Sequence, residues 1–137
     1  MTILLVEDNL AHQKITEYVL KRNNVKANIF VVRDGQEALD FLFHKNSYAD
    51  FSTFPTPDLI LLDLNLPKRD GREVLMVIKS DPALKDIPVV IVSTSDREED
   101  VNYAFQNGVA AYISKSKGFD KYTVELVDVA KYARPQQ

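Results

Sequence analysis

Three acidic residues stand where apolar stretches of the sequence end. Glu7 and Asp8 follow the run Thr2 to Val6, and Asp63 follows the run Leu59 to Leu62. If these runs are neighbouring strands, the three carboxylates meet at one edge, where they raise one another's pKa unless a cation intervenes. Oxygen ligands, with no cysteine in the chain and no nearby histidine, suit Mg²⁺. The residue types alone fit equally well an alternative in which these acids are exposed and serve solubility.

Two further polar residues end apolar runs later in the chain. Ser93 closes the run Val89 to Val92, and Lys115 follows the run Ala110 to Ser114. A hydroxyl and an ammonium beside a metal-bound carboxylate make a site for a phosphoryl group, because they bind its oxygens and neutralise its charge. Asp63 is then a candidate nucleophile, since carboxylates form acyl phosphates. Taken singly, Ser93 and Lys115 are ordinary strand-end and solvated residues, so the prediction depends on the whole set.

Other acidic residues fit helix starts. The segments Asp34 to Glu37, Asp70 to Glu73 and Asp96 to Glu99 each carry an aspartate followed three residues later by a glutamate, which is the spacing of a capping box. We therefore predict that their aspartates cap helices. His12 and His44 lie in helical stretches without the spacing of metal ligands, and we predict that both are surface residues.

The elements that must position these residues alternate along the chain. Runs rich in Val, Ile and Leu predict five strands, at Thr2 to Val6, Ala27 to Val32, Leu59 to Leu62, Val89 to Ser93 and Ala110 to Ser114. Five segments with helical periodicity lie between and after them. This alternation predicts a parallel sheet with helices on both faces and a functional crevice at the carboxyl ends of the strands. The long connection at about residues 45 to 57 carries Tyr48, Phe51 and Phe54, and is expected to be a packed surface loop.

Composition limits the classes of function. The chain has 137 residues, 45% of them hydrophobic and 27% charged, which predicts one globular domain with a large core. The absence of cysteine excludes disulfides and thiol chemistry. A net charge of −3 argues against broad binding to nucleic acid. The apolar runs are too short to cross a bilayer and no secretory signal is present, so we expect a cytoplasmic protein with no membrane partner.

The order and spacing of these residues resemble the receiver domain of two-component response regulators. The matching motifs are Ile3 to Asp8, Asp63 to Gly71, Ser93-Thr94 and Tyr112 to Lys115. The intervals of 30 residues from 63 to 93 and 22 residues from 93 to 115 are also close to those of the family. The resemblance covers about residues 2 to 132. It implies an α/β, flavodoxin-like, doubly wound (βα)5 fold with a five-stranded parallel sheet in the order 2-1-3-4-5.

The resemblance also implies roles for individual residues. Asp63 looks like the phosphoacceptor, which takes a phosphoryl group from a histidine kinase. Asp8, Asp63 and the main-chain carbonyl of Asn65 look like Mg²⁺ ligands, with Glu7 acting through water. In this reading the protein is a signalling phosphoacceptor that catalyses only its own phosphorylation and dephosphorylation.

Three more residues match the part of the family motif that responds to phosphorylation. Ser93 resembles the switch hydroxyl, Lys115 the cation that pairs with the phosphoryl group, and Tyr112 the switch aromatic, although Tyr112 also fits a plain core position. The family works by a population shift in the fourth helix and fifth strand. One departure is Ser116, which stands where receivers usually have a cis proline. Either the Lys115-Ser116 bond is cis, or it is trans and Lys115 is placed differently.

A finer resemblance points to the stand-alone receivers that serve phytochrome-type kinases. It implies a phytochrome-like kinase partner and a homodimer through the fourth helix, fifth strand and fifth helix. Val101, Phe105, Tyr112 and Tyr122 are candidates for that dimer face, with core packing as the alternative. Because Arg134 to Gln137 ends the chain just past the fifth helix, we expect residues 1–137 to form a single receiver domain with no output domain.

Three other functions remain open at this point. A Mg²⁺-dependent phosphohydrolase with Asp63 as nucleophile is disfavoured by Asn65, because such enzymes usually have an acid two residues after the nucleophile. A nucleotide or flavin binder is disfavoured because Glu7 and Asp8 replace a Gly-rich phosphate loop. A pseudo-receiver that binds partners without phosphorylation is disfavoured by the intact acidic set and kept open by Ser116.

Overall fold

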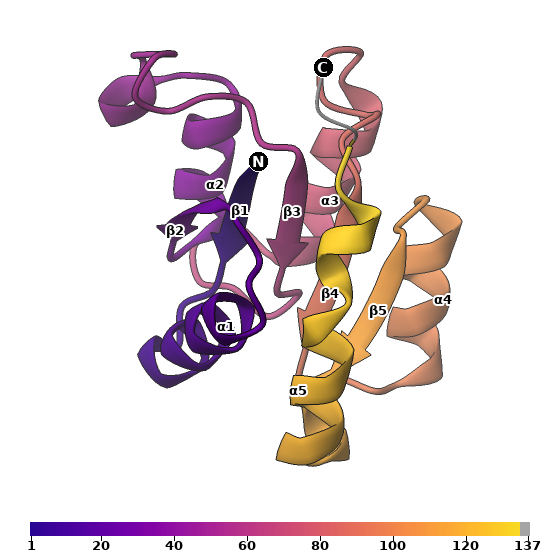
Figure 1. Cartoon of the computed structure of the whole chain (residues 1–137). Helices are drawn as coiled ribbons and strands as arrows, with labels where there is room; N and C mark the ends of the chain where they lie inside the picture. The colour runs from indigo at the N-terminus through magenta and orange to yellow at the C-terminus, as the bar shows by residue number, and fades with distance from the viewer. Residues whose placement is uncertain (135–137) are drawn as a thin grey trace.

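A single parallel sheet forms the centre of the molecule (Figure 1). The computed structural model describes residues 1–134. Its five strands lie in the order β2-β1-β3-β4-β5, which confirms the predicted flavodoxin-like arrangement. The strands are β1 Thr2–Val6, β2 Asn28–Val32, β3 Leu59–Leu62, β4 Val89–Ser93 and β5 Ala111–Ser114. Each lies within one residue of its predicted bounds, because buried parallel strands leave a continuous apolar run in the sequence.

Helices cover both faces of the sheet. They are α1 Leu10–Arg22, α2 Gly35–Leu42, α3 Gly71–Ser80, α4 Glu98–Gln106 and α5 Phe119–Val127, with short 3-10 helices η1 Asn46–Tyr48, η2 Lys115–Lys117 and η3 Val129–Tyr132. Helices α1 and α5 lie on one face, while α2, α3 and α4 lie on the other (Figure 1). Among residues 1–134, no helix has both the length and the apolar character needed to cross a bilayer.

Alternate residues of β1 face the two halves of the core. Leu4 packs with the residues of α2, α3 and α4, whereas Ile3 and Leu5 pack with those of α1 and α5. Full burial of one such side chain contributes about 1.5–3 kcal/mol. The register pairs Val6 of β1 with Leu62 of β3. Consequently the residues that follow these two positions emerge side by side at the carboxyl edge of the sheet.

The predicted caps are correct at two helices and wrong at the third. Asp34 accepts a hydrogen bond from the backbone N–H of Glu37, and Asp70 caps α3 in a similar way. Helix α4 instead begins after Arg97, whose side chain makes no capping hydrogen bond. Asp96 does not cap this helix: it accepts a hydrogen bond of 3.1 Å from the hydroxyl of Ser116. The helix starts one residue later than a cap at position 96 requires.

The aromatic connection before β3 packs as predicted. Tyr48 and Phe54 lie against each other at a centroid distance of 4.9 Å, and both contact Phe41 of α2. Phe51 stays exposed and stacks on the ring of His44. The loop therefore extends the core beyond the edge strand β2.

Candidate functional site

The carboxyl ends of β1 and β3 bring three acidic residues together. Glu7, Asp8 and Asp63 each offer an oxygen within 4.8 Å of the others. Glu7 and Asp63 are buried, with 2% and 6% of their surface exposed, whereas Asp8 is exposed. Two buried carboxylates and one exposed carboxylate provide the hard oxygen ligands that Mg²⁺ prefers, and the exposed position leaves room for water. The structure thus favours a cation site over the alternative of exposed surface acids.

Lys115, which directly follows the edge strand β5, also reaches this cluster. Its ammonium contacts Glu7 Oε1 and lies 3.3 Å from Asp63 Oδ2, with only 4% of the side chain exposed. There is no cis peptide bond in residues 1–134, so the bond between Lys115 and Ser116 is trans. Lys115 nevertheless lies beside Asp63, as the resemblance to receivers implies. We call Glu7, Asp8, Asp63 and Lys115 the acidic pocket.

The acidic pocket has more negative than positive charge. It contains three carboxylates and one ammonium, which contacts Glu7 and Asp63. Burial raises the pKa of Glu7 to about 7; the hydrogen bond and charge of Lys115 lower it, and the charge of Asp63 raises it. Because a divalent cation would remove this imbalance, the donor set fits Mg²⁺ or a similar ion. Glu7, Asp8 and Asp63 are the residues that would hold it.

Gly71 allows α3 to start directly against the end of β3. A Cβ atom at this position would lie 2.2 Å from the main-chain oxygen of Asp63, so no larger residue fits without movement. The backbone N–H of Gly71 also donates to the carbonyl of Leu64 at 3.0 Å. Asn65 lies just beyond, exposed, and its backbone N–H donates to Asp63 Oδ1 at 2.9 Å. This tight turn fixes the orientation of the Asp63 carboxylate.

Ser93 and Tyr112 both contact the loop between β4 and α4. Ser93 is fully buried at the end of β4, and its hydroxyl accepts a hydrogen bond from the backbone N–H of Ser95 at 3.2 Å. Tyr112 is half-buried, and its hydroxyl donates to the carbonyl of Ser95 at 2.7 Å. Its ring packs at the edge of the core. Ser95 therefore joins the two predicted switch residues.

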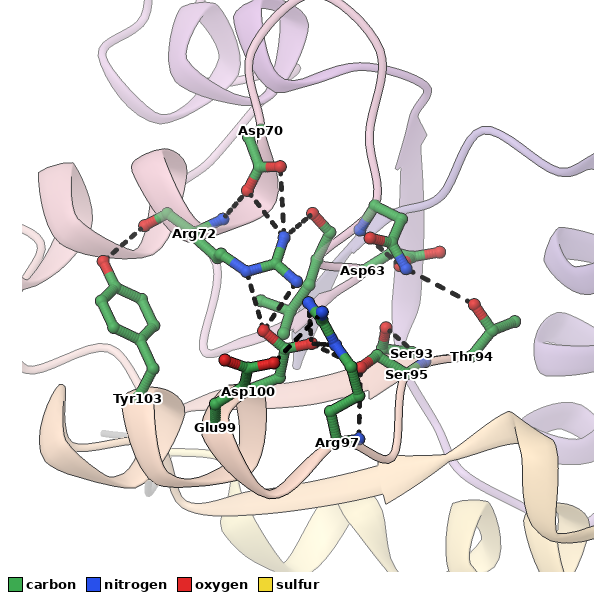
Figure 2. A network of polar contacts seen from close by, with 12 residues as sticks. Asp63, Asp70, Arg72, Ser93, Thr94, Ser95, Arg97, Glu99, Asp100 and Tyr103 are labelled. Atoms are coloured by element: carbon green, nitrogen blue, oxygen red, sulfur yellow. Dashed lines mark hydrogen bonds and ion pairs between the residues drawn. The ribbon is translucent and has the colours of Figure 1, made fainter.

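A second charge cluster lies next to this loop, and no pattern in the sequence predicts it. Asp100 of α4 is 4% exposed and accepts hydrogen bonds from Ser95 Oγ at 2.5 Å, from Arg72 Nη2 at 2.8 Å and from Arg97 Nε at 3.1 Å (Figure 2). Burial acts to raise the pKa of Asp100, but these hydrogen bonds outweigh it and lower the pKa to about 2. We call Arg72, Ser95, Arg97 and Asp100 the arginine cluster.

The arginine cluster connects three elements. Arg72 belongs to the first turn of α3, Ser95 and Arg97 to the loop after β4, and Asp100 to the first turn of α4. Arg72 also binds Asp70 through Nη1 at 3.1 Å, and Figure 2 shows both contacts of its guanidinium. No periodicity or motif links these residues, because the two members of the main ion pair are 28 positions apart.

Both histidines differ from their predicted surface positions. His12 is half-buried, and its Nδ1 lies 3.1 Å from Lys115 Nζ at the edge of the acidic pocket. His44 is also half-buried; it stacks on Phe51 and lies 3.3 Å from the hydroxyl of Thr56. The error at His12 matters for function, because this residue contacts Lys115 of the acidic pocket. The two residues are 103 positions apart in the sequence.

The residues suggested for a dimer face separate into two groups. Tyr122 is buried and its hydroxyl pairs with that of Thr16 at 2.9 Å, so it belongs to the core between α1 and α5 and cannot form a surface. Phe105 is 51% exposed on α4, while Val101 and Tyr112 are half-buried. The core alternative therefore holds for Tyr122, and Phe105 remains the exposed candidate.

Comparisons with known proteins agree with this geometry. Residues 3–126 match the response regulator receiver domain family. The response regulator Rcp1 of Synechocystis sp. is 46% identical over 115 residues, which are 84% of this chain and 76% of that protein.

Two solved structures extend the comparison. The Mn²⁺-bound form of Rcp1 superimposes with a TM-score of 0.86 at 40% identity, over 96% of this chain and 92% of that one. The phosphorylated cyanobacterial phytochrome response regulator RcpA gives a TM-score of 0.87 at 43% identity, again over 96% and 92% of the two chains. The resemblance to the phytochrome-associated subgroup is therefore confirmed. The chain belongs to the response regulator receiver domain family.

Proposed function

We propose that the protein accepts a phosphoryl group on Asp63 from a histidine kinase, with Mg²⁺, and thereby changes a surface that binds other proteins. The observation that carries this proposal is the position of Asp63 within 4.8 Å of the other two acids and 3.3 Å from the ammonium of Lys115. Glu7, Asp8, Asp63 and the carbonyl of Asn65 are the proposed ligands of the ion. The proposed location is the cytoplasm, and we expect no catalysis beyond the protein's own phosphorylation and dephosphorylation.

In the proposed reaction, a carboxylate oxygen of Asp63 attacks the phosphorus of a phosphohistidine. The O–P bond of an acyl phosphate forms while the N–P bond breaks, and the imidazole leaves with the electron pair and takes up a proton. The cation would supply neutralisation of the phosphoryl charge. Lys115 pairs with one phosphoryl oxygen, and the hydroxyl of Ser93 donates to another. The turn at Gly71 holds the attacking oxygen in place.

The proposed switch begins at Ser93. When its hydroxyl turns toward the phosphoryl group, the hydrogen bond from the N–H of Ser95 is lost. Ser95 also accepts from Tyr112 and donates to Asp100, so a shift of the loop reaches β5 and α4 together. Phosphorylation would thus favour a second arrangement of this face over the one seen here.

A phytochrome-like kinase is the partner we propose. Support comes from the likeness to RcpA, which is described as a phosphorylated cyanobacterial phytochrome response regulator. We also propose a homodimer through α4, β5 and α5. The exposed ring of Phe105 on α4 supports that face.

Intact-mass spectrometry after incubation with acetyl phosphate and Mg²⁺ tests the reaction. We expect one added phosphoryl group, which EDTA and Asp63→Asn both abolish. Asp120→Asn is the matched control, because Asp120 is exposed on α5 and its variant should be phosphorylated like the wild type. No adduct, with Mg²⁺ binding intact and no release of phosphate, would overturn the proposal in favour of a pseudo-receiver.

A further inference from the structure

The ammonium of Lys115 has three acceptors around it, and one of them lies outside the residues assigned so far. A lysine ammonium has three donor hydrogens and no acceptor. Glu7 and Asp63 account for two of these hydrogens, and Nδ1 of His12 lies at 3.1 Å to accept the third. Because only 4% of the Lys115 side chain is exposed, water has little room to replace any of them.

Local structure places His12 at this position. Its backbone N–H donates to the side chain of Asn9 at 3.0 Å, which caps α1. His12 therefore lies in the first turn of the helix, beside the mouth of the acidic pocket, with 30% of its side chain exposed. Since the ammonium can only donate, Nδ1 must be the acceptor, and the ring is the neutral form with its proton on Nε2. Burial and the nearby charge of Lys115 lower the pKa of His12, which agrees with that form.

The three acceptors differ in what happens to them during phosphorylation. Asp63 becomes an acyl phosphate, and Glu7 is one of the residues that would hold the cation, so both carboxylates then have another partner besides Lys115. His12 takes no part in either event. Its Nδ1 is occupied by Lys115 and so does not serve the cation as a ligand. It is the acceptor that can keep its contact with the ammonium throughout.

We propose that His12 is a positioning residue for Lys115, which it holds in place while the ammonium exchanges a carboxylate oxygen for a phosphoryl oxygen. This inference rests on the proposed phosphoacceptor function. It explains why a histidine in the first turn of α1 faces the pocket and not the solvent. It also assigns a contact that holds Lys115 in place, in a loop where Ser116 stands at the position that is usually proline in receivers.

Rates of phosphorylation by acetyl phosphate test this role. We expect His12→Leu to slow phosphorylation about tenfold at saturating Mg²⁺ with no change in the Mg²⁺ concentration at half-saturation. His12→Asn, which keeps an acceptor near the position of Nδ1, should stay within threefold of the wild type. In a Lys115→Met background, His12→Leu should have no further effect, because the contact it removes is already absent. A tenfold loss that persists in that background, or a His12→Leu rate equal to the wild type, would overturn the proposal.

Nitrogen-15 NMR of the imidazole rings tests the contact without any reaction. We expect an unprotonated, hydrogen-bonded Nδ1 at His12, with a signal that shifts in Lys115→Met. His44, the second of the two histidines in the chain, is the internal control and should not respond. A protonated Nδ1, or a His12 signal unchanged in Lys115→Met, would overturn the assignment. A wild type that shows the contact and yet takes up no phosphoryl group would instead count against the proposed function.

Discussion

The acidic pocket and the arginine cluster both bury charged groups, but in opposite balance. The acidic pocket holds three carboxylates and only one ammonium, that of Lys115, and the pKa of Glu7 is raised to about 7. In the arginine cluster one carboxylate, Asp100, binds two guanidinium groups and a hydroxyl, and its pKa is lowered to about 2. Each cluster contains a buried carboxylate, so the ratio of cations to carboxylates separates the two. A cluster with an excess of carboxylates is prepared for a cationic ligand, whereas one whose buried carboxylate is fully paired holds the fold.

Ser95 links the arginine cluster to Ser93, the predicted switch residue. Its N–H donates to Ser93, and its hydroxyl donates to Asp100. The arginine cluster thus fixes the loop that the proposed switch must move. This arrangement predicts that charges of the arginine cluster matter for stability and those of the acidic pocket for chemistry.

The largest expected effect is on stability, at Asp100. Asp100→Asn should lower the free energy of unfolding by about 3 kcal/mol, because it removes the buried charge that accepts hydrogen bonds from Ser95, Arg72 and Arg97. The two arginines keep only their exposed partners, Asp70 and Glu99. Asp70→Asn is the matched control: Asp70 binds the same Arg72, but its side chain is 51% exposed, and asparagine still caps α3. We expect a loss below about 1 kcal/mol there. Urea denaturation of both variants makes the measurement, and equal losses would remove the distinction between the clusters.

How much of this contrast the sequence predicts depends on the distance between partners along the chain. Glu7 and Asp63 could be placed together because each ends a strand and neighbouring parallel strands end at one edge. Arg72 and Asp100 could not, because each alone reads as an exposed charge near a helix start. The contact of His12 was missed for the same reason. Strands and their ends leave a local pattern, whereas side-chain contacts between distant loops leave none.

The pH dependence of stability should show the acidic pocket most directly. The pKa of Glu7 rises from 4.5 in the unfolded chain to about 7 in the folded protein. The stabilising contribution of Glu7 to the free energy of unfolding is therefore fully present below pH 4.5. It is lost as the pH rises through about 7, a change of about 3 kcal/mol. In EDTA, the difference in unfolding free energy between wild type and Glu7→Gln should change by this amount between pH 4.5 and 8. A difference independent of pH would mean that Glu7 keeps its ordinary pKa.

Addition of Mg²⁺ should reverse part of that loss. At ten times its dissociation constant, the ion should stabilise the wild type by about 1.4 kcal/mol, because it binds only the folded protein. Asp63→Asn removes a ligand and should lose most of the stabilisation by Mg²⁺. Asp100→Asn should keep this stabilisation, even though the variant is less stable than the wild type without the ion. Thermal unfolding with Mg²⁺ and with EDTA provides the test. Loss of the Mg²⁺ effect in Asp100→Asn would show that the clusters are not separate.

The smallest effect is expected at Tyr112, which contacts the loop after β4. Tyr112→Phe keeps the ring in the core and removes one hydrogen bond, to the carbonyl of Ser95. The cost should be about 1 kcal/mol, because the arginine cluster still holds the loop through Asp100. Phosphorylation should stay within about twofold of the wild type, since Tyr112 touches none of the reacting atoms. A loss as large as that of Asp100→Asn would mean that Tyr112, and not the arginine cluster, keeps this loop in place.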